Sequence, residues 1–293
     1  MEIAGSDVRF DRPMRLYTTF RVGGNAAALV RAGSLEVLRH THAYAGAAGI
    51  PWVVVGKGSN LLVSDRGFPG VVIRLRGALA EVSGDEGEGV LSAGGGATNR
   101  RILDRCVLEG LGGLEFLAGI PGTAGGAVAT NAGAGGGSTA EALRRVELLT
   151  EGGEVEDLPA GALRFSYRGC SLPAGSVVTR THFGVRRGAP ESVRERIDRN
   201  LEKRRRSQPL RFPSAGSVFR NPPEGSAWRL VSEAGLGGKR IGGAEISRLH
   251  ANFIVNRGGA TAEDVLSLMN LAREAVLRRT GIELEPEIRT VGF

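Results

Sequence analysis

One segment of the chain, Gly110 to Gly137, contains eleven glycines in 28 residues. Backbone without side chains can approach a phosphate closely, and consecutive amide groups can point at it. Neither of the common phosphate-binding patterns, GxGxxG and GxxxxGKS/T, occurs anywhere in the sequence. The segment is therefore either a dinucleotide site of another architecture or a set of tight turns that pack small residues between strands.

A second glycine loop, Gly56-Lys57-Gly58-Ser59-Asn60, follows the apolar run Trp52–Val55. Its position after an expected strand suits a phosphate-binding loop, although many turns after strands have this composition. The loop gains weight from the first glycine segment, because a dinucleotide needs contacts along its whole length. Together the two loops favour a dinucleotide ligand.

Three positions farther along the chain carry side chains suited to catalysis. Arg168 could hold a carboxylate with two hydrogen bonds, or it could lie on the surface beside its aromatic neighbours. Ser217 is outside any GxSxG motif and has no histidine close in sequence, which disfavours a nucleophilic triad. Glu285 and Glu287 would face the same side of a strand, either in a site or in solvent.

A strongly basic stretch from Arg194 to Arg211 supplies much of the formal net charge of +7. Acidic residues interrupt it, aromatic residues that would stack on bases are nearly absent, and no zinc or helix-turn-helix pattern accompanies it. We interpret it as a solvated helix face or as a rim that attracts anionic ligands, rather than as a nucleic-acid site.

Composition restricts the remaining classes. The two cysteines, Cys106 and Cys170, give no disulfide framework and suit a reducing compartment. The four histidines have no metal-ligand spacing, so no metal is expected. No apolar run approaches the roughly 18 residues that span a bilayer, and charged residues near the N-terminus do not suit a signal peptide. We predict a cytoplasmic protein.

The elements that must position these groups are a mixture of helices and strands. Ser34 is expected to cap a helix, and Gly281 to end one. We expect a hairpin turn at 151–154, between the fourth and fifth strands. The expected helices are 35–48, 99–109, 191–206 and 263–279, and the expected strands are 52–55, 71–75, 90–93, 145–149, 177–185 and 284–291. In the last helix the inward-facing residues are expected to be Val265, Leu268, Met269, Leu271 and Val276.

Seven segments, in this order, resemble the UDP-N-acetylenolpyruvoylglucosamine reductase family, FAD enzymes of peptidoglycan precursor synthesis. Each motif is modest, but their order and spacing are specific and cover nearly the whole chain. About 50 residues separate Arg168 from Ser217, which resembles the shorter, second type of the enzyme. The segments are TTFRVGG (18–24), VVVGKGSNLLVSDRGFPGVVIRL (53–75), GLEFLAGIPGTAGGAVATNAGA (113–134), FSYRGC (165–170), RRRSQPLRFPSAGSVFRNP (204–222), IGGAEISRLHANFIVNRGGAT (241–261) and LEPEIRTVG (284–292).

The resemblance implies an α+β fold with two domains. Residues 1–190 would form an FAD-binding domain of the vanillyl-alcohol-oxidase/PCMH class, in subdomains of about 1–75 and 76–190. Residues 191–293 would form a C-terminal α+β substrate-binding domain. FAD would bind non-covalently, with 119–126 along its pyrophosphate. The implied cofactor-binding residues are Gly56, Lys57, Gly58, Ser59, Asn60, Gly119, Ile120, Pro121, Gly122, Thr123, Gly125, Gly126, Ala127, Asn131, Ala132, Gly133 and Ala134.

The resemblance also implies catalytic roles. Arg168 and Glu287 would stabilise an enolate, and Ser217 would donate a proton to the neighbouring carbon. Glu287 fits the family pattern better than Glu285, because it directly precedes Ile288-Arg289. Asn221 and Arg289 occupy substrate-binding positions.

One departure from the family concerns a lysine that it often carries in a GLKG segment. Here the segment reads Gly235-Leu236-Gly237-Gly238-Lys239. Lys239 could take the place of that lysine from two residues farther on, so no substrate-binding lysine is assigned in this segment.

The implied reaction is the NADPH-dependent reduction of UDP-N-acetylglucosamine enolpyruvate to UDP-N-acetylmuramate. We expect a small-molecule substrate, no nucleic-acid or membrane partner, and a monomer or weak oligomer. Two alternatives remain open: another flavin enzyme of the same fold with a different substrate, and a non-enzymatic protein that binds nucleic acid through its basic helix.

Overall fold

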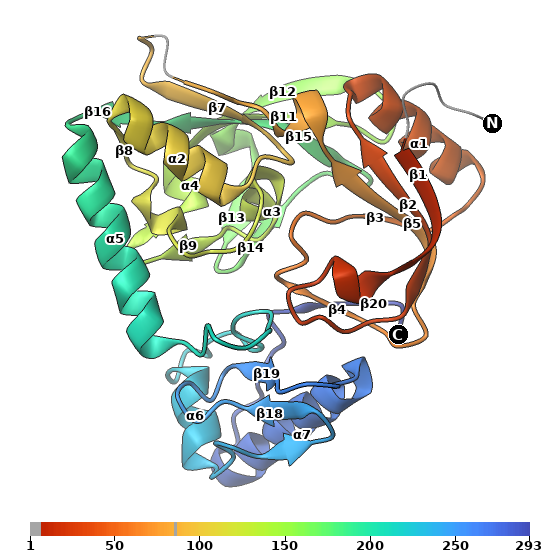
Figure 1. Cartoon of the computed structure of the whole chain (residues 1–293), viewed down its shortest axis with the longest axis vertical. Helices are drawn as coiled ribbons and strands as arrows, with labels where there is room; N and C mark the ends of the chain where they lie inside the picture. The colour runs from red at the N-terminus through yellow and green to blue at the C-terminus, as the bar shows by residue number, and fades with distance from the viewer. Residues whose placement is uncertain (1–6, 85–86) are drawn as a thin grey trace. The chain divides into compact units, whose positions relative to one another are not determined.

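The computed structural model describes residues 7–84 and 87–293. The chain forms two compact units, and each unit combines segments that are far apart in sequence (Figure 1). Unit 1 comprises Met1–Phe10, Ala28–Lys57 and Gly70–Lys203, and unit 2 comprises Asp11–Ala27, Gly58–Pro69 and Arg204–Phe293. The domain boundary near residue 190 stays a prediction, since the units divide at 203/204 and take two N-terminal segments into unit 2.

A four-stranded sheet with the order β1-β2-β5-β3 contributes to unit 1. Its strands are β1 (Asp7–Pro13), β2 (Asn25–Ala32), β5 (Phe68–Leu75) and β3 (Trp52–Val54). Helix α1 (Leu35–Ala47) begins at Ser34, whose side chain accepts the amide of Val37 as predicted. Apolar residues of α1, β2 and β5 form one core beneath this sheet. Strands β1, β2 and β5 each begin in one unit and end in the other.

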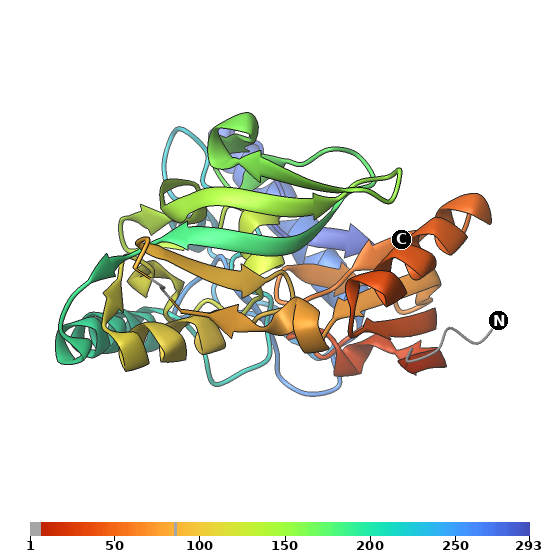
Figure 2. The ribbon, with the colours of Figure 1, turned by 90° about the horizontal axis from the view of Figure 1, so that it is seen from above.

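The second sheet of unit 1 has five strands in the order β12-β11-β15-β7-β6, which lie side by side in Figure 2. Its larger core includes apolar residues of α2 (Asn99–Glu109) and α3 (Ala124–Ala129). Thr98 caps α2, and Gly110 ends it in the left-handed conformation. The strands are β12 (Val155–Pro159), β11 (Leu143–Leu149), β15 (Val177–Gly184), β7 (Val90–Gly94) and β6 (Val82–Ser83).

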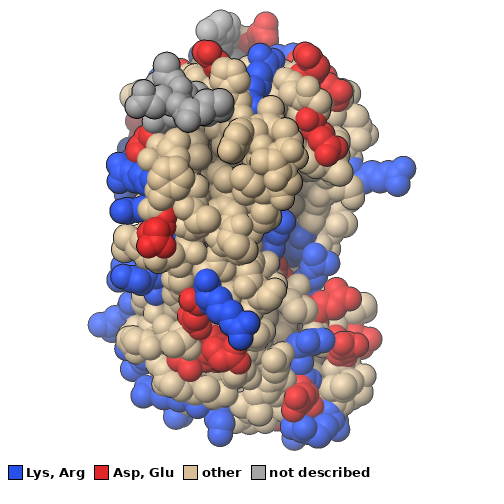
Figure 3. All heavy atoms as spheres, turned by 90° about the vertical axis from the view of Figure 1, so that its right-hand side faces the viewer, with Lys and Arg blue, Asp and Glu red and all other residues tan. Residues whose placement is uncertain are grey.

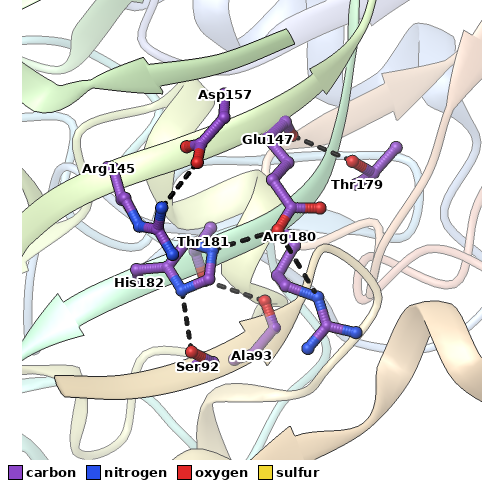
Figure 4. A network of polar contacts seen from close by, with 9 residues as sticks. All are labelled: Ser92, Ala93, Arg145, Glu147, Asp157, Thr179, Arg180, Thr181 and His182. Atoms are coloured by element: carbon purple, nitrogen blue, oxygen red, sulfur yellow. Dashed lines mark hydrogen bonds and ion pairs between the residues drawn. The ribbon is translucent and has the colours of Figure 1, made fainter. Parts of the chain in front are cut away.

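A buried histidine links three strands of this sheet (Figure 4). His182 Nδ1 on β15 lies 2.7 Å from Ser92 Oγ on β7, and its Nε2 lies 3.2 Å from Glu147 Oε1 on β11. The same carboxylate oxygen lies 3.9 Å from Arg180 Nε. The order serine–histidine–carboxylate is that of a nucleophilic triad. The contacts of these three side chains tie neighbouring strands of the sheet together, which is a structural role.

Short elements complete unit 1, and one long helix begins in this unit and ends in unit 2. Helix α5 covers Pro190–Ser207, as the basic stretch predicts, and Arg196 on it pairs with Glu115 at 2.8 Å. The short elements are η2 (Gly77–Ala80), β8 (Leu111–Gly112), η3 (Glu115–Leu117), β9 (Gly133–Ala134), β10 (Gly137–Ser138), α4 (Thr139–Ala142), η4 (Ala160–Ala162), β13 (Arg164–Ser166), β14 (Gly169–Ser171) and β16 (Arg186–Arg187).

Unit 2 is built on helix α7 (Ala262–Thr280). Thr261 and Asp264 form a capping box, and Asp65 accepts the amides of Ala262 and Glu263 at the same end. The helix packs on the three-stranded sheet β17-β18-β19. The other elements are η1 (Met14–Leu16), β4 (Leu61–Val63), α6 (Ala227–Glu233), β17 (Arg240–Ile241), β18 (Ala244–Ile246), β19 (Ile254–Asn256) and β20 (Arg289–Val291).

All four predicted helices are confirmed within two residues at each end. In α7, Val265, Leu268, Met269 and Val276 are buried and Leu271 is partly buried. Gly281 ends this helix with φ +73°.

Two strand predictions are wrong in part. The strand expected at 284–291 is limited to β20, because Pro286 has no amide hydrogen to continue a ladder. The turn at 151–154 joins β11 to β12, a strand that the sequence pattern does not predict, rather than to β15.

Among residues 7–84 and 87–293, no helix is both long and apolar enough to cross a membrane. On the face drawn in Figure 3, basic and acidic side chains are interspersed.

Candidate functional site

The glycine segment places a loop, residues 119–123, between η3 and α3 in unit 1. Among the described residues, the amides of Gly119, Gly122 and Thr123 have no hydrogen-bond acceptor. These three are therefore the amides that a ligand could use. Four other amides of the segment are already engaged: Ile120 with Leu117 O, Ala124 with Ala97 O, Gly125 with Gly95 O, and Gly126 with Thr123 Oγ1.

The second glycine loop touches the first. A Cβ placed on Gly56 would lie 2.5 Å from Thr123 Oγ1, so only glycine permits this approach. The side chain of Thr123 also accepts the amide of Gly126 and caps α3. The structure thus brings Gly56 together with the 119–126 segment. The sequence pairs them only because a dinucleotide needs contacts along its whole length.

The rest of the second loop has other partners. Lys57 is exposed at the end of a unit 1 segment, and Gly58, Ser59 and Asn60 belong to unit 2. Gly58 has φ +63°, and a Cβ there would lie 2.2 Å from the carbonyl oxygen of Tyr17. Asn60 Nδ2 donates to the carbonyl of Glu287 at 3.2 Å, and the carbonyl of Asn60 accepts the amide of Arg289 at 2.9 Å.

Asn131 to Ala134 follow α3, as a turn that runs into β9. Asn131 adopts φ +42° and is fixed at both ends of its amide: Nδ2 donates to Ser166 O, and Oδ1 accepts the amide of Ala140. Ala132 is buried. Gly133 offers its carbonyl to Arg168, which joins this segment to a predicted catalytic residue.

Arg168 occupies the turn of the β13–β14 hairpin with φ +58°. A non-glycine residue in the left-handed region stores strain of the order of 1 kcal/mol or more, which is frequent at functional sites. One guanidinium nitrogen donates to Gly133 O at 2.9 Å, and the guanidinium lies 5.4 Å from the ring centroid of Tyr167. The side chain is therefore held against the 131–134 segment.

Ser217 lies in unit 2 on an extended segment beside Phe253. The next residue, Val218, donates its amide to the carbonyl of Asn252 at 2.9 Å. The side chain of Asn252 is itself buried and bonds both backbone groups of Phe219: Oδ1 accepts the amide at 2.9 Å and Nδ2 donates to the carbonyl at 2.8 Å. These contacts fix the backbone around a half-buried serine.

Glu287 lies next to this segment. Its amide donates to the carbonyl of Val218 at 2.8 Å, and its side chain is half-buried. Glu285, by contrast, has a side chain that is 74% exposed and lies 3.8 Å from Arg220. The two glutamates, which a continuous strand would place on the same side, therefore differ in their exposure to solvent.

The predicted substrate-binding positions also lie in unit 2. Asn221 is exposed, and its Oδ1 accepts the amide of Ala227 at the start of α6. Arg289 is exposed at the start of β20, which pairs in parallel with β4. Lys239 is exposed as well, and its carbonyl accepts the amide of Ile246.

Other reactive side chains are less suited to chemistry. Burial raises the pKa of the Cys106 thiol to about 12, and burial also raises the pKa of Cys170. Burial lowers the pKa of His250, which packs between the rings of Trp228 and Phe253. Within the described ranges, no group of three or more His, Cys, Asp or Glu could hold a metal ion.

The sequence alone predicts neither the contacts of Asn252 nor the hydrogen bond from Asn60 to the carbonyl of Glu287. Both act through hydrogen bonds to backbone groups that are remote in sequence, 33 residues away for Asn252 and 227 for Asn60. No local pattern marks such a partner. Asn252 lies within the segment 241–261 that carries the family resemblance, but no motif assigns it a role.

Two family models match this chain, one in its N-terminal half and one in its C-terminal part. Residues 208–291 match the family model "UDP-N-acetylenolpyruvoylglucosamine reductase, C-terminal domain", and residues 26–159 match "FAD binding domain". The UDP-N-acetylenolpyruvoylglucosamine reductase of Geobacter metallireducens is 46% identical over 99% of this chain and 96% of its own length. That of Myxococcus xanthus is 42% identical over 99% of this chain and 94% of its own length.

A solved structure is similar over nearly the whole chain. The crystal structure of UDP-N-acetylenolpyruvylglucosamine reductase from Thermus caldophilus has a TM-score of 0.83 and 38% identity, and the match covers 98% of both chains. The α+β fold, with an FAD-binding domain and a family-specific C-terminal domain, is thereby confirmed.

Proposed function

The chain belongs to the UDP-N-acetylenolpyruvoylglucosamine reductase family, and on that basis we propose that it reduces UDP-N-acetylglucosamine enolpyruvate to UDP-N-acetylmuramate with NADPH as the electron donor. It is an FAD oxidoreductase. The detailed proposal rests on the hydrogen bond from the amide of Glu287 to the carbonyl of Val218. This bond holds side by side the two segments that carry the candidate catalytic residues Ser217 and Glu287.

The glycine loops of unit 1 fit the phosphates of FAD. Gly56 lies against Thr123 with no room for a side chain, and the amides of Gly119, Gly122 and Thr123 have no acceptor among the described residues. Amide groups of this kind suit a pyrophosphate. When bound, FAD supplies the hydride for the reduction. We assign the closest contacts to these residues and assign Gly125 a packing role, since its amide is already engaged.

Arg168 and Glu287 are proposed to stabilise negative charge on the substrate. Addition of hydride to the enolpyruvyl methylene carbon leaves charge on the neighbouring carbon and its carboxylate. A guanidinium remains protonated throughout the physiological range and can hold a carboxylate with two hydrogen bonds. Arg168 is set for such a role by its hydrogen bond to Gly133 and its left-handed backbone. Glu287, if protonated or hydrogen-bonded, would assist in stabilising the charge on the substrate carboxylate.

Ser217 is proposed to give its hydroxyl proton to the carbon that carries the charge. A serine hydroxyl is a weak acid, so this transfer requires a strongly basic carbon acceptor, which the enolate provides. The serine also needs a fixed position, and the hydrogen bonds on both sides of residues 217–219 supply one.

The substrate carries a diphosphate and a carboxylate, and we propose that Asn221 and Arg289 contact it. Oδ1 of Asn221 accepts the amide of Ala227, whereas its Nδ2 makes no hydrogen bond within the described residues. We place the reaction in the cytoplasm, as a step of peptidoglycan precursor synthesis. Cysteine usage supports a reducing compartment.

Rapid mixing of the Ser217→Ala variant tests the proposal. Reduction of the bound FAD by NADPH, followed by its absorbance, should proceed at the wild-type rate. Reoxidation by UDP-N-acetylglucosamine enolpyruvate should be nearly abolished. Normal reoxidation by the substrate would exclude Ser217 as the proton donor.

A further inference from the structure

The glycine loop 119–123 is held in place by one residue of α2, Asn99. Asn99 is the first residue of this helix and is only 2% exposed. Its backbone amide donates to the carbonyl of Gly122 at 3.2 Å, and its side-chain Nδ2 donates to the carbonyl of Ile120 at 3.0 Å. A single residue therefore fixes two carbonyl groups of the loop.

The bond to Gly122 also sets the direction of a free amide. In a trans peptide the carbonyl and the amide of the next residue point in opposite directions. Because the Gly122 carbonyl points at Asn99, the amide of Thr123 points away from α2. This amide has no acceptor among the described residues. The Ile120–Pro121 peptide has no N–H to present, so the bond to its carbonyl serves only to hold the loop.

The backbone on both sides already carries part of this arrangement. Thr98 and Thr123 form an isolated antiparallel bridge, which brings the start of α2 against the end of the loop. A substitution at Asn99 would leave such main-chain contacts available. The bond from Nδ2 to Ile120 is the contact that depends on the side chain, so its contribution can be measured separately.

The side chain of Asn99 is poorly explained by helix stability alone. Its Oδ1 is buried and accepts no hydrogen bond from the described residues, which costs free energy of folding. A leucine of similar size would fill the space without that cost. Only the nitrogen of the amide can face a carbonyl oxygen, and a Cβ on Gly122 would lie 3.2 Å from this nitrogen. The loop thus packs directly on the donor.

We propose that Asn99 is a positioning residue for the pyrophosphate of FAD. It acts through the loop, whose free amides at Gly119, Gly122 and Thr123 it holds ready for the phosphate oxygens before the cofactor binds. The positive end of α2 lies at the Gly122 carbonyl and polarises this peptide, which strengthens the amide of Thr123 as a donor. The inference rests on the proposed placement of the FAD phosphates at this loop.

The FAD dissociation constant of two variants tests this role. Asn99→Leu removes the side-chain donor and keeps approximately the size of the residue. Serial dilution of the holoenzyme, followed by the rise in flavin fluorescence, gives the Kd. We expect it to increase roughly tenfold, the effect of losing about one hydrogen bond. Asn99→Ala removes the same donor with less bulk and should have the same effect, so the test does not depend on how leucine packs.

Thr181→Val is the matched control. It removes one buried bond from a side chain to a backbone carbonyl elsewhere in unit 1, from Thr181 Oγ1 to Ala93 O at 3.0 Å (Figure 4). The denaturant midpoint of the apoprotein should fall as it does in the Asn99 variants, with the FAD Kd unchanged. An equal increase in Kd for this control would reduce the effect to general stability and overturn the proposal.

Wild-type FAD affinity in both Asn99 variants would also overturn it. Gly119→Ala then shows which assignment has failed, because Gly119 has φ +70° and a side chain there strains the loop directly. If only Gly119→Ala weakens FAD binding, the loop holds the phosphates and Asn99 does not position it. If neither substitution does, the phosphates of FAD lie elsewhere. The rapid-mixing experiment on Ser217 is independent of both results.

Discussion

The amide of Glu287 donates a hydrogen bond to the carbonyl of Val218, at 2.8 Å. Val218 directly follows Ser217, so one backbone contact fixes the spacing of the two segments that carry the proposed proton donor and carboxyl group. The side chain of Asn252 bonds the backbone of Phe219 in the serine segment, and the side chain of Asn60 bonds the carbonyl of Glu287. The four chain segments that carry these residues are thus joined by hydrogen bonds inside unit 2.

Asn252→Ala should disturb these hydrogen bonds at one point. The substitution leaves the amide and carbonyl of Phe219 without partners in a buried setting, which should lower the free energy of unfolding by about 2–4 kcal/mol. Reoxidation of the flavin by the substrate should slow roughly tenfold or more, with NADPH reduction unchanged. Asn252→Asp keeps the acceptor and should give an intermediate rate. A purely structural role predicts lower stability with both half-reactions unchanged.

Glu287→Gln and Glu285→Gln form a matched pair two residues apart. The half-buried Glu287 is proposed to act on the substrate, whereas Glu285 is largely exposed. We expect Glu287→Gln to slow reoxidation by about 10²-fold or more, in the range of a lost acid–base group. Glu285→Gln should react at nearly the wild-type rate in the same rapid-mixing experiment. Equal effects of the two substitutions would contradict the assignment.

Arg168→Lys keeps the charge but loses the planar, two-pronged donor. Substrate reduction should fall by about 10²–10³-fold, the usual effect of removing a donor to a developing anion. Arg164→Lys is the control, because Arg164 is exposed on β13 of the same hairpin. Steady-state kinetics should leave the control near the wild type. Full activity of Arg168→Lys would show that charge alone suffices.

Gly56→Ala should weaken FAD binding. The new Cβ would overlap Thr123 Oγ1 at 2.5 Å and force the two glycine loops apart. Overpacking of this kind costs about 1–3 kcal/mol, which corresponds to roughly tenfold in FAD affinity. Gly161→Ala is the matched control, since a Cβ there meets nothing within 4 Å. The ratio of flavin to protein absorbance measures the effect, and an unchanged ratio would remove Gly56 from the cofactor site.

His250 should make stability depend on pH. Burial holds the pKa of the folded-state imidazole below its ordinary value of 6.5. Between these two pKa values the unfolded chain binds a proton that the folded chain does not, so stability is lost as pH falls below about 6.5. Denaturant unfolding at pH 7 and pH 5.5 should show a smaller loss for His250→Asn. His40→Asn, on the exposed side of α1, should keep the wild-type loss.

Local signals account for the parts of the fold that the sequence predicts well. Helices α2 and α7 have capping residues at their start and glycine in the left-handed conformation at their end, and both features are visible within a few residues. Strand β12 is missed because its residues are mostly exposed and show no apolar alternation. The strand expected at 284–291 fails at Pro286, where pairing depends on a remote partner, Phe219.

The candidate site shows the same division. Composition alone points to the glycine loops, and family motifs point to Arg168, Ser217 and Glu287. The strain at Arg168, the contact between Gly56 and Thr123 and the clamp formed by Asn252 all depend on residues that are distant in sequence. Such contacts exist only once the chain has folded, so no spacing rule reveals them.

The discontinuous make-up of unit 2 bears on how the chain folds during synthesis. Phe20, Val22 and Leu62 lie in the same core as α7, and Asn256 bonds the carbonyl of Phe20 across 236 positions. The N-terminal part of this core therefore leaves the ribosome long before its partners exist. Contacts of such high sequence separation close slowly, and the early apolar segments stay exposed meanwhile. We expect nascent chains that stop before residue 204 to need chaperone protection for Phe20, Val22 and Leu62.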